Sequence, residues 1–151
     1  MGKDVSIKIH MASEVIAERS IHFDYKHKGL SANGGNCARG DYIANNKSTN
    51  IFFAEGYTGE GYRTWLCLYN LGTEDALVEI SYFTQEAGQL PVRTIAIPSR
   101  SRRTICVNDN AGEDLQVSSM LKVISGGGIV VERSVYFDCN SANGGHVEIK
   151  L

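Results

Sequence analysis

The chain has 151 residues, enough for one hydrophobic core, and a formal net charge of −2. This charge balance gives no reason to expect a nucleic-acid partner or a polybasic contact with a membrane. No apolar run approaches the ~20 residues that a membrane helix needs, so we expect no membrane insertion. Sixteen glycines separate short runs of β-branched and aromatic residues, which indicates strands and turns.

The beginning of the chain repeats its end. Residues 15–24 (VIAERSIHFD) return as 129–138 (IVVERSVYFD), and SANGG at 31–35 returns unchanged at 141–145. Matches in the same order indicate an internal repeat of about 110 residues, of which the first copy is incomplete. We therefore predict a partial repeat over 1–35, a linker over 36–50 and a complete module over 51–151.

In chain order, Val5, Ile7 and Ile9 share one side of a predicted strand, and 15–23 form the next. The stretch 26–50 is poor in apolar residues and predicts a long loop. Further strands, bounded by turn residues, are predicted at 51–54, 64–69, 76–83, 92–97, 103–107, 118–124 and 129–137. Short strands at this spacing without helices favour an all-β, immunoglobulin-like sandwich of about seven strands, with a closed barrel as the alternative.

Two charged residues occupy positions on apolar faces. Arg133 lies on the same face of its predicted strand as Val131 and Val135, and Glu55 lies on the same face as Phe53. A buried charge is costly unless it is paired, so we predict a Glu55–Arg133 salt bridge. The alternative is that both side chains lie exposed at the rim.

The cysteines lack the spacings of a zinc site, and we predict neither a metal nor a cofactor. Cys67 and Cys106 both point away from aliphatic neighbours, so a disulfide between them is one hypothesis and two inert thiols the other. Trp65 and Tyr69 share the face opposite Leu66, where they either contact a glycan or cover a neighbouring module. Asn46 begins a glycosylation pattern. The sequence contains no nucleophile elbow, phosphate loop or zinc-protease motif, which favours a protein that is not an enzyme.

Several segments together resemble a known type of repeat: 53–59 (FAEGYTG), 64–70 (TWLCLYN), 78–83, 97–104, 129–137 and the closing GGH at 144–146. They are similar to the tandem modules of large secreted or surface-attached bacterial proteins of unknown function. The resemblance implies an immunoglobulin-like module in an extracellular array at the cell surface, and it brings no catalytic residues.

The incomplete copy leads to a prediction about assembly. A two-stranded ribbon is marginal in water, and the apolar side chains of this one need cover. The residues expected to dock, either on their own module or on a neighbouring chain, are Ile7, Ile9, Val15, Arg19, Ile21 and Phe23. If strands of a second copy complete this partial repeat, the contacts are head-to-tail and give a structural or adhesive filament. The alternative function is a carbohydrate-binding module that recognises surface glycans through its exposed aromatic residues.

Overall fold

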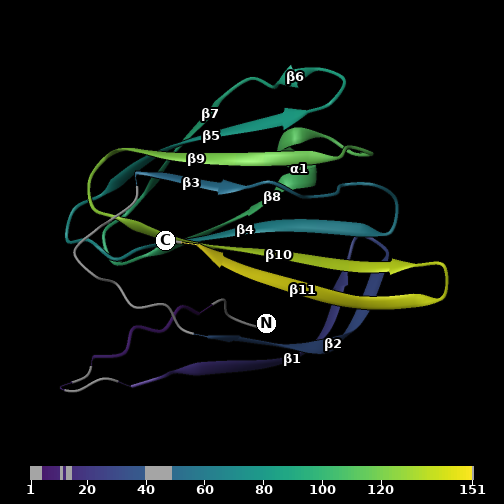
Figure 1. Cartoon of the computed structure of the whole chain (residues 1–151), viewed down its shortest axis with the longest axis horizontal. Coiled ribbons are helices and arrows are strands. Elements are labelled where there is room, and N and C mark those ends of the chain that lie inside the picture. Colours follow the sequence, from purple (N-terminus) through teal and green to yellow (C-terminus); the bar gives the residue numbers. More distant parts are fainter. Residues whose placement is uncertain (1–4, 11, 13–14, 40–48, 151) are drawn as a thin grey trace.

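The computed structural model describes residues 5–10, 12, 15–39 and 49–150, and this part of the chain consists mainly of antiparallel strands (Figure 1). The all-β class predicted from the sequence is confirmed. The elements are β1 Glu18–His27, β2 Leu30–Arg39, β3 Asn50–Phe53, β4 Tyr62–Asn70, β5 Ala76–Thr84, β6 Gly88–Gln89, β7 Arg93–Ile97, β8 Arg102–Cys106, α1 Val107–Ala111, β9 Val117–Ser125, β10 Ile129–Cys139 and β11 Ala142–Lys150.

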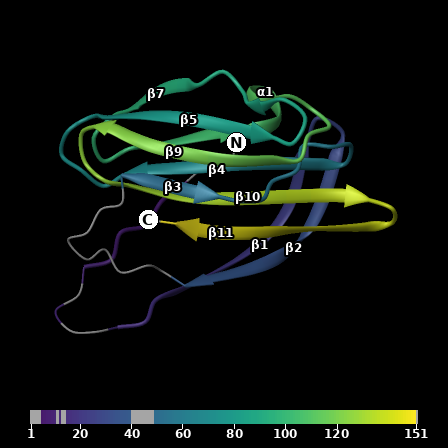
Figure 2. The same cartoon turned by 45° about the horizontal axis from the view of Figure 1, so that its top comes forward.

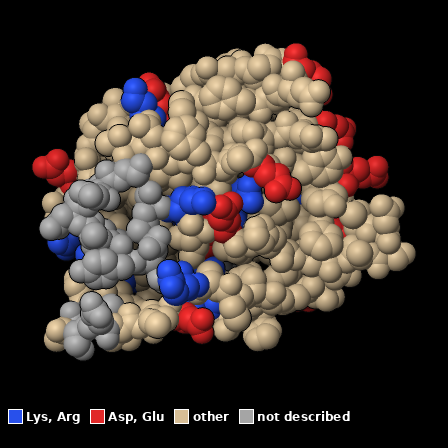
Figure 3. Space-filling model, viewed as in Figure 1, with Lys and Arg blue, Asp and Glu red and all other residues tan. Residues whose placement is uncertain are grey.

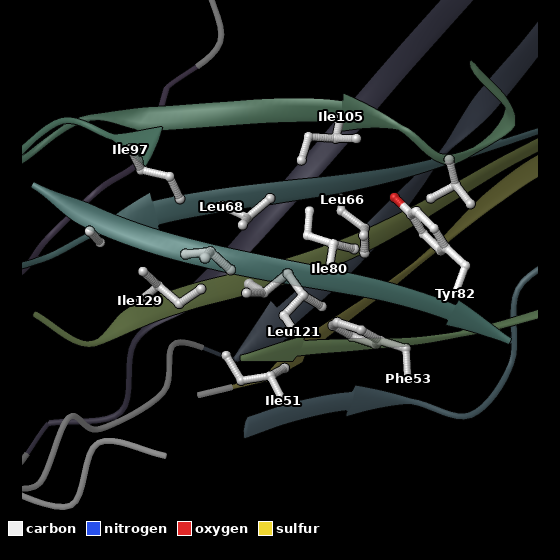
Figure 4. Close-up of a cluster of buried hydrophobic side chains, with 14 of the residues drawn as sticks. Ile51, Phe53, Leu66, Leu68, Ile80, Tyr82, Ile97, Ile105, Leu121 and Ile129 are labelled. Carbon is white, nitrogen blue, oxygen red and sulfur yellow. The ribbon is translucent and has the colours of Figure 1, made fainter. Parts of the chain in front are cut away.

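Two sheets pack face to face around one core. The first has the strand order β11-β10-β4-β8, and the second has the order β3-β9-β5-β6 with β7 also paired to β5. On β4 the buried Leu66 and Leu68 alternate with half-buried neighbours, so one face of the strand supplies the core. The core draws on both sheets and includes Ile51, Phe53, Leu66, Leu68, Val78, Ile80, Tyr82, Ile97, Leu121 and Val131 (Figure 4).

The immunoglobulin-like topology is not confirmed. In that fold the first two strands of the module lie in the same sheet. Here the first module strand, β3, pairs with β9, whereas β4 lies in the opposite sheet between β10 and β8. The strands that the sequence predicts from residue 51 onward are present, but they are distributed between the sheets in a different way.

Strands β1 and β2 form a separate hairpin that lies against the outer face of the four-stranded sheet (Figures 1 and 2). Its ladder runs without interruption from the pair Glu18↔Arg39 to the pair His27↔Leu30. Lys28 and Gly29 close the hairpin with φ angles of 47° and 85°, as a tight two-residue turn requires. This hairpin crosses the sheet and does not extend it.

The internal repeat corresponds to a duplicated β-hairpin. Phe23 lies opposite Gly34 in the first copy, and Phe137 lies opposite Gly144 in the second. In each copy the phenylalanine ring covers the glycine, since a Cβ placed on Gly34 or Gly144 would meet the ring of its partner at 3.2 or 3.0 Å. Each aromatic ring thus supplies the side-chain contact that a glycine in a strand lacks.

Two predictions about elements were wrong, and one strand has no counterpart among the predicted elements. The predicted loop 26–50 contains β2, whose Gly- and Asn-rich sequence is held in a strand by its pairing with β1. Strand β11 was not predicted, for the same compositional reason. Residues 5–9, predicted to form a strand, lie outside any strand, and Val5, Ile7 and Ile9 are 72%, 73% and 56% exposed. Their alternation favours a strand, but the single chain supplies no paired neighbour among the described residues.

Candidate functional site

The outer face of the four-stranded sheet carries polar and aromatic side chains. On β4, Arg63, Trp65 and Tyr69 alternate with the buried leucines and are half-buried. On β10, Glu132 and Tyr136 occupy the same face, because their positions alternate with that of the buried Val131. The β1–β2 hairpin covers part of this face, which we call the outer face below.

Aromatic contacts attach the hairpin to the outer face. The rings of Tyr25 and Tyr136 stack, with centroids 4.1 Å apart and an interplanar angle of 4°. Phe23 meets Tyr136 edge-on at 5.1 Å, and His27 meets Trp65 at 5.3 Å. The Trp65 indole Nε1 donates a hydrogen bond of 3.0 Å to the Tyr25 hydroxyl. Burial raises the pKa of Tyr25 to about 12, so this hydroxyl stays protonated at neutral pH.

Two ion pairs join the hairpin to the module, one near the start of β1 and one at the hairpin tip. Arg19 Nη1 donates to Glu132 Oε2 at 2.7 Å, and at the hairpin tip Lys28 Nζ donates to Asp109 Oδ1 at 2.5 Å. The Lys28–Asp109 hydrogen bond raises the pKa of Lys28 and lowers the pKa of Asp109. Both partners of this second pair are about half exposed, so solvent screens their attraction.

Backbone groups of β2 also contact the second hairpin. The Ser31 N–H donates to Asp138 Oδ2 at 3.3 Å, and the Asn33 N–H donates to Asn143 Oδ1 at 3.4 Å. The close approach of the two hairpins depends on Gly145, because a Cβ at this position would lie 2.9 Å from the Phe23 ring. The repeated Gly-Gly sequence therefore allows the two hairpins to lie in contact.

The interface leaves some polar groups unsatisfied. Arg19 Nε and Nη2, His27 Nε2 and Asn36 Oδ1 are buried without a hydrogen-bond partner. Each such group carries a desolvation penalty that no protein hydrogen bond offsets. The hairpin is consequently held less firmly than its aromatic contacts alone would suggest.

The predicted Glu55–Arg133 ion pair is wrong. Arg133 is buried, 5% exposed, as its position among valines predicts, but its Nη2 contacts Glu148 Oε2 at 3.1 Å. Its guanidinium also lies 5.5 Å from the centroid of the Phe53 ring. Glu55 is exposed. The partner, Glu148, lies directly opposite Arg133 in the ladder, on strand β11, which is not among the predicted strands.

The Cys67–Cys106 disulfide is absent. All four cysteines, each within the described part of the chain, carry thiols. The register places Cys106 opposite Trp65, and Cys67 opposite Thr104, so the two thiols lie diagonally on neighbouring strands. Cys106 is buried, and this burial raises the pKa of its thiol.

The structure divides the residues predicted to dock into two groups. Arg19, Ile21 and Phe23 are half-buried and face the module of their own chain. Ile7, Ile9 and Val15 are exposed. The hairpin therefore docks in cis. It also covers Trp65, one half of the predicted glycan-binding pair, while Tyr69 stays half-buried.

Four residues of this interface are not among those predicted from the sequence: Tyr25, His27, Glu132 and Tyr136. The signal that could have identified the first two is the alternation from Arg19 to His27, which continues the inward face of the strand beyond its predicted end at residue 23. Glu132 and Tyr136 can be recognised as contact residues only when it is known that the hairpin covers the outer face. Asn46 of the glycosylation pattern lies outside the described residues.

Other kinds of site find little support among the described residues. No group of three or more His, Cys, Asp or Glu side chains is arranged there to hold a metal ion. The helical segment found in the described ranges is too short and too polar to be a membrane span. On the face seen in Figure 3, acidic and basic side chains are interspersed and do not form a patch of one sign.

Solved structures share this fold. The crystal structure of Thermotoga maritima 1070 matches with a TM-score of 0.62 at 18% identity, covering 69% of this chain and 93% of that chain. Anabaena sensory rhodopsin transducer matches with a TM-score of 0.50 at 24% identity, covering 58% of this chain and 95% of that chain. At such identities the likeness shows a common fold and not a common function. No model of a known protein family matches the chain, and no curated protein matches it significantly.

These matches overturn the resemblance to tandem modules of secreted bacterial proteins, and with it the predicted function of an extracellular adhesive repeat or carbohydrate-binding module. The physical reason lies in the repeat. The duplicated sequence indicated an array of modules, whereas the described part of the repeat forms two hairpins of one chain in contact with each other.

Proposed function

We propose that this chain relays a signal by binding a partner protein through the outer face of its four-stranded sheet. The observation that carries the proposal is that this face already holds a β-hairpin without strand pairing, by aromatic contacts, ion pairs and two hydrogen bonds from β2 backbone N–H groups. Trp65, Glu132 and Tyr136 provide an indole donor, a carboxylate and a flat ring on one sheet. Surfaces that bind proteins combine aromatic anchors with a few directed polar groups in this way.

The likeness in fold to a protein named as a sensory rhodopsin transducer supports a role in relaying signals. A relay needs a surface whose occupant can change. Buried nitrogens of Arg19 and His27 lack hydrogen-bond partners, which weakens the binding of the hairpin to the outer face. The hairpin can therefore be replaced there by another binding partner. We propose further that the chain acts without catalysis, since its sequence carries no nucleophile elbow, phosphate loop or zinc-protease motif.

Site-directed photocrosslinking tests the proposal in the cells that make the chain. A photoreactive phenylalanine at position 69 lies on the outer face, and the same residue at Leu77 lies on the opposite sheet, where the native side chain is 37% exposed. We expect one defined protein crosslinked from position 69 and not from position 77. Identical products from both positions, or products with no protein other than the chain itself, would contradict the proposal.

A further inference from the structure

The β1–β2 hairpin is structurally self-contained. Its ten-pair ladder joins only its own two strands, and none of its described residues pairs with a strand of the two main sheets. Its turn at Lys28–Gly29 is also internal. The hairpin can therefore leave the outer face without breaking any backbone hydrogen bond of a ladder.

The module does not depend on the hairpin for its core. The buried cluster between the two sheets is made of residues from Ile51 to Val131, and no residue of β1 or β2 belongs to it. What holds the hairpin is a surface contact that resembles an interface between proteins more than the interior of a domain. Release of the hairpin would expose Trp65 and Tyr136 but leave the core intact.

The chain is long enough to carry the hairpin to another molecule. Ten residues lie between Arg39 at the end of β2 and Asn50 at the start of β3. A segment of this length can span up to about 33 Å, by the reach of an extended chain. A neighbouring copy within that reach presents the same outer face, with the same contacts for Arg19, Phe23 and Tyr25.

An exposed apolar segment precedes the hairpin. Val5, Ile7 and Ile9, together with Val15 and Ile16 at 56% and 79% exposure, have no cover in the single chain. Several exposed apolar side chains along one short stretch of sequence favour contact with another protein. Because the segment continues directly into β1, any movement of the hairpin to a second copy brings this segment with it.

From these observations we infer that two copies of this chain exchange their β1–β2 hairpins, each hairpin occupying the outer face of the other copy, in a closed two-fold dimer. Each copy donates and receives the same hairpin, so every contact seen within one chain is re-formed between chains, and the exchange closes without a free end. Each exchanged hairpin also carries the exposed segment that precedes it, so association can cover Val5, Ile7 and Ile9, which the single chain leaves exposed. This assembly differs from a head-to-tail array.

Disulfide trapping distinguishes the exchanged dimer from the monomer. The backbone nitrogen of Asn33 lies 3.4 Å from Asn143 Oδ1, so these two residues are in contact across the interface, and Asn33→Cys and Asn143→Cys serve as the trapping pair. One chain carries the first substitution and a second chain carries the other, in a background where Cys37, Cys67, Cys106 and Cys139 are replaced by serine. We expect the mixed chains to form a crosslinked heterodimer under mild oxidation. Asn33→Cys mixed with Leu77→Cys, on the opposite sheet, is the control and should give no crosslinked heterodimer.

Sedimentation equilibrium of the unmodified chain provides a readout independent of the cysteine-free background. We expect the unmodified chain to form a dimer. In the Ile7→Ser/Ile9→Ser variant the dissociation constant of this dimer should rise at least about tenfold, because two apolar side chains that the dimer buries are removed. The matched control is Phe52→Ser, which removes an apolar side chain that is 59% exposed on the other sheet and should leave the constant unchanged. An unmodified chain that stays monomeric at ~100 μM would overturn the inference. A dimer that forms no disulfide between positions 33 and 143, when the cysteine-free chain has been shown to fold, would also overturn it. Neither result depends on the external partner proposed above.

Discussion

Arg19 of the first hairpin donates a 2.7 Å hydrogen bond to Glu132 of the second, and both belong to the repeated tripeptide Glu-Arg-Ser. The two copies of this tripeptide use their charges differently. Arg133, the counterpart of Arg19, turns into the module and contacts Glu148, while Glu18, the counterpart of Glu132, is exposed. The duplicated sequence thus supplies one arginine for the core region and one for the contact between hairpins.

A double-mutant cycle measures this contact. We expect Arg19→Ala and Glu132→Ala to couple by about 1 kcal/mol in the free energy of unfolding, because the pair is only partly exposed, at 34% and 19%. Glu18→Ala is the matched control, and its effect should stay within about 0.5 kcal/mol. Equal effects of Glu18→Ala and Glu132→Ala would show that the ion pair contributes nothing.

Tyr25→Phe tests the hydrogen bond to the indole. The substitution keeps the ring stacked on Tyr136 but leaves the Trp65 N–H without its acceptor, which should cost about 1 kcal/mol. Trp65 is the single tryptophan of the chain, so its emission spectrum reports the change directly. Tyr69→Phe serves as the control on the same face. If both variants retain the parent emission spectrum, the indole hydrogen bond does not form.

Arg133→Ala and Glu55→Ala distinguish the observed ion pair from the predicted one. Arg133 is buried against Phe53, so its removal should lower the free energy of unfolding by about 2–3 kcal/mol through lost packing and pairing. Glu148 is 32% exposed and keeps Lys150 at 2.7 Å, which limits the penalty for leaving it unpaired. Glu55→Ala should change stability by less than about 0.5 kcal/mol. Chemical denaturation checks both values, and a large loss in Glu55→Ala would restore the original pairing.

The tip contact makes hairpin docking sensitive to pH. The hydrogen bond from Lys28 holds the pKa of Asp109 below its ordinary 3.8, so its contribution is present above that value and is lost as pH falls through the lowered pKa. The raised pKa of Lys28 means that its contribution persists below 10.5 and is lost as pH rises through the raised pKa. Acrylamide quenching of Trp65 should therefore increase at acidic pH. In Asp109→Asn this acid-dependent increase should be smaller, and an unchanged profile would contradict the assignment.

The strands of the module could be predicted because their side chains alternate between a core and an outer face. From 51–54 to 129–137, each predicted strand overlaps an observed one. Strands β2 and β11 could not be predicted in the same way, because each presents Asn-Gly-Gly where a strand ordinarily places apolar side chains. Their conformation depends on pairing with β1 and β10, and pairing between strands is a tertiary property that composition does not report.

The site was predictable only in part, for a related reason. Arg133 could be recognised as buried from its valine neighbours, but its partner depends on the register of β11. Phe23 and Arg19 could be identified as docking residues, whereas the surface that receives them requires the crossing of hairpin and sheet. The predicted extracellular location stays a prediction, as do the division of the chain at residues 35 and 50 and the absence of a cofactor.

Native-state hydrogen exchange of the intact chain tests most directly whether the outer face is a binding surface with an exchangeable occupant. We expect the amides of β1 and β2 to exchange together, through an opening that costs less free energy than opening of β4, β5 and β9. This opening should become easier in Arg19→Ala, while protection of the core strands stays the same. Exchange of β1 and β2 at the rate of the core strands, through global unfolding alone, would show that the hairpin does not leave the outer face.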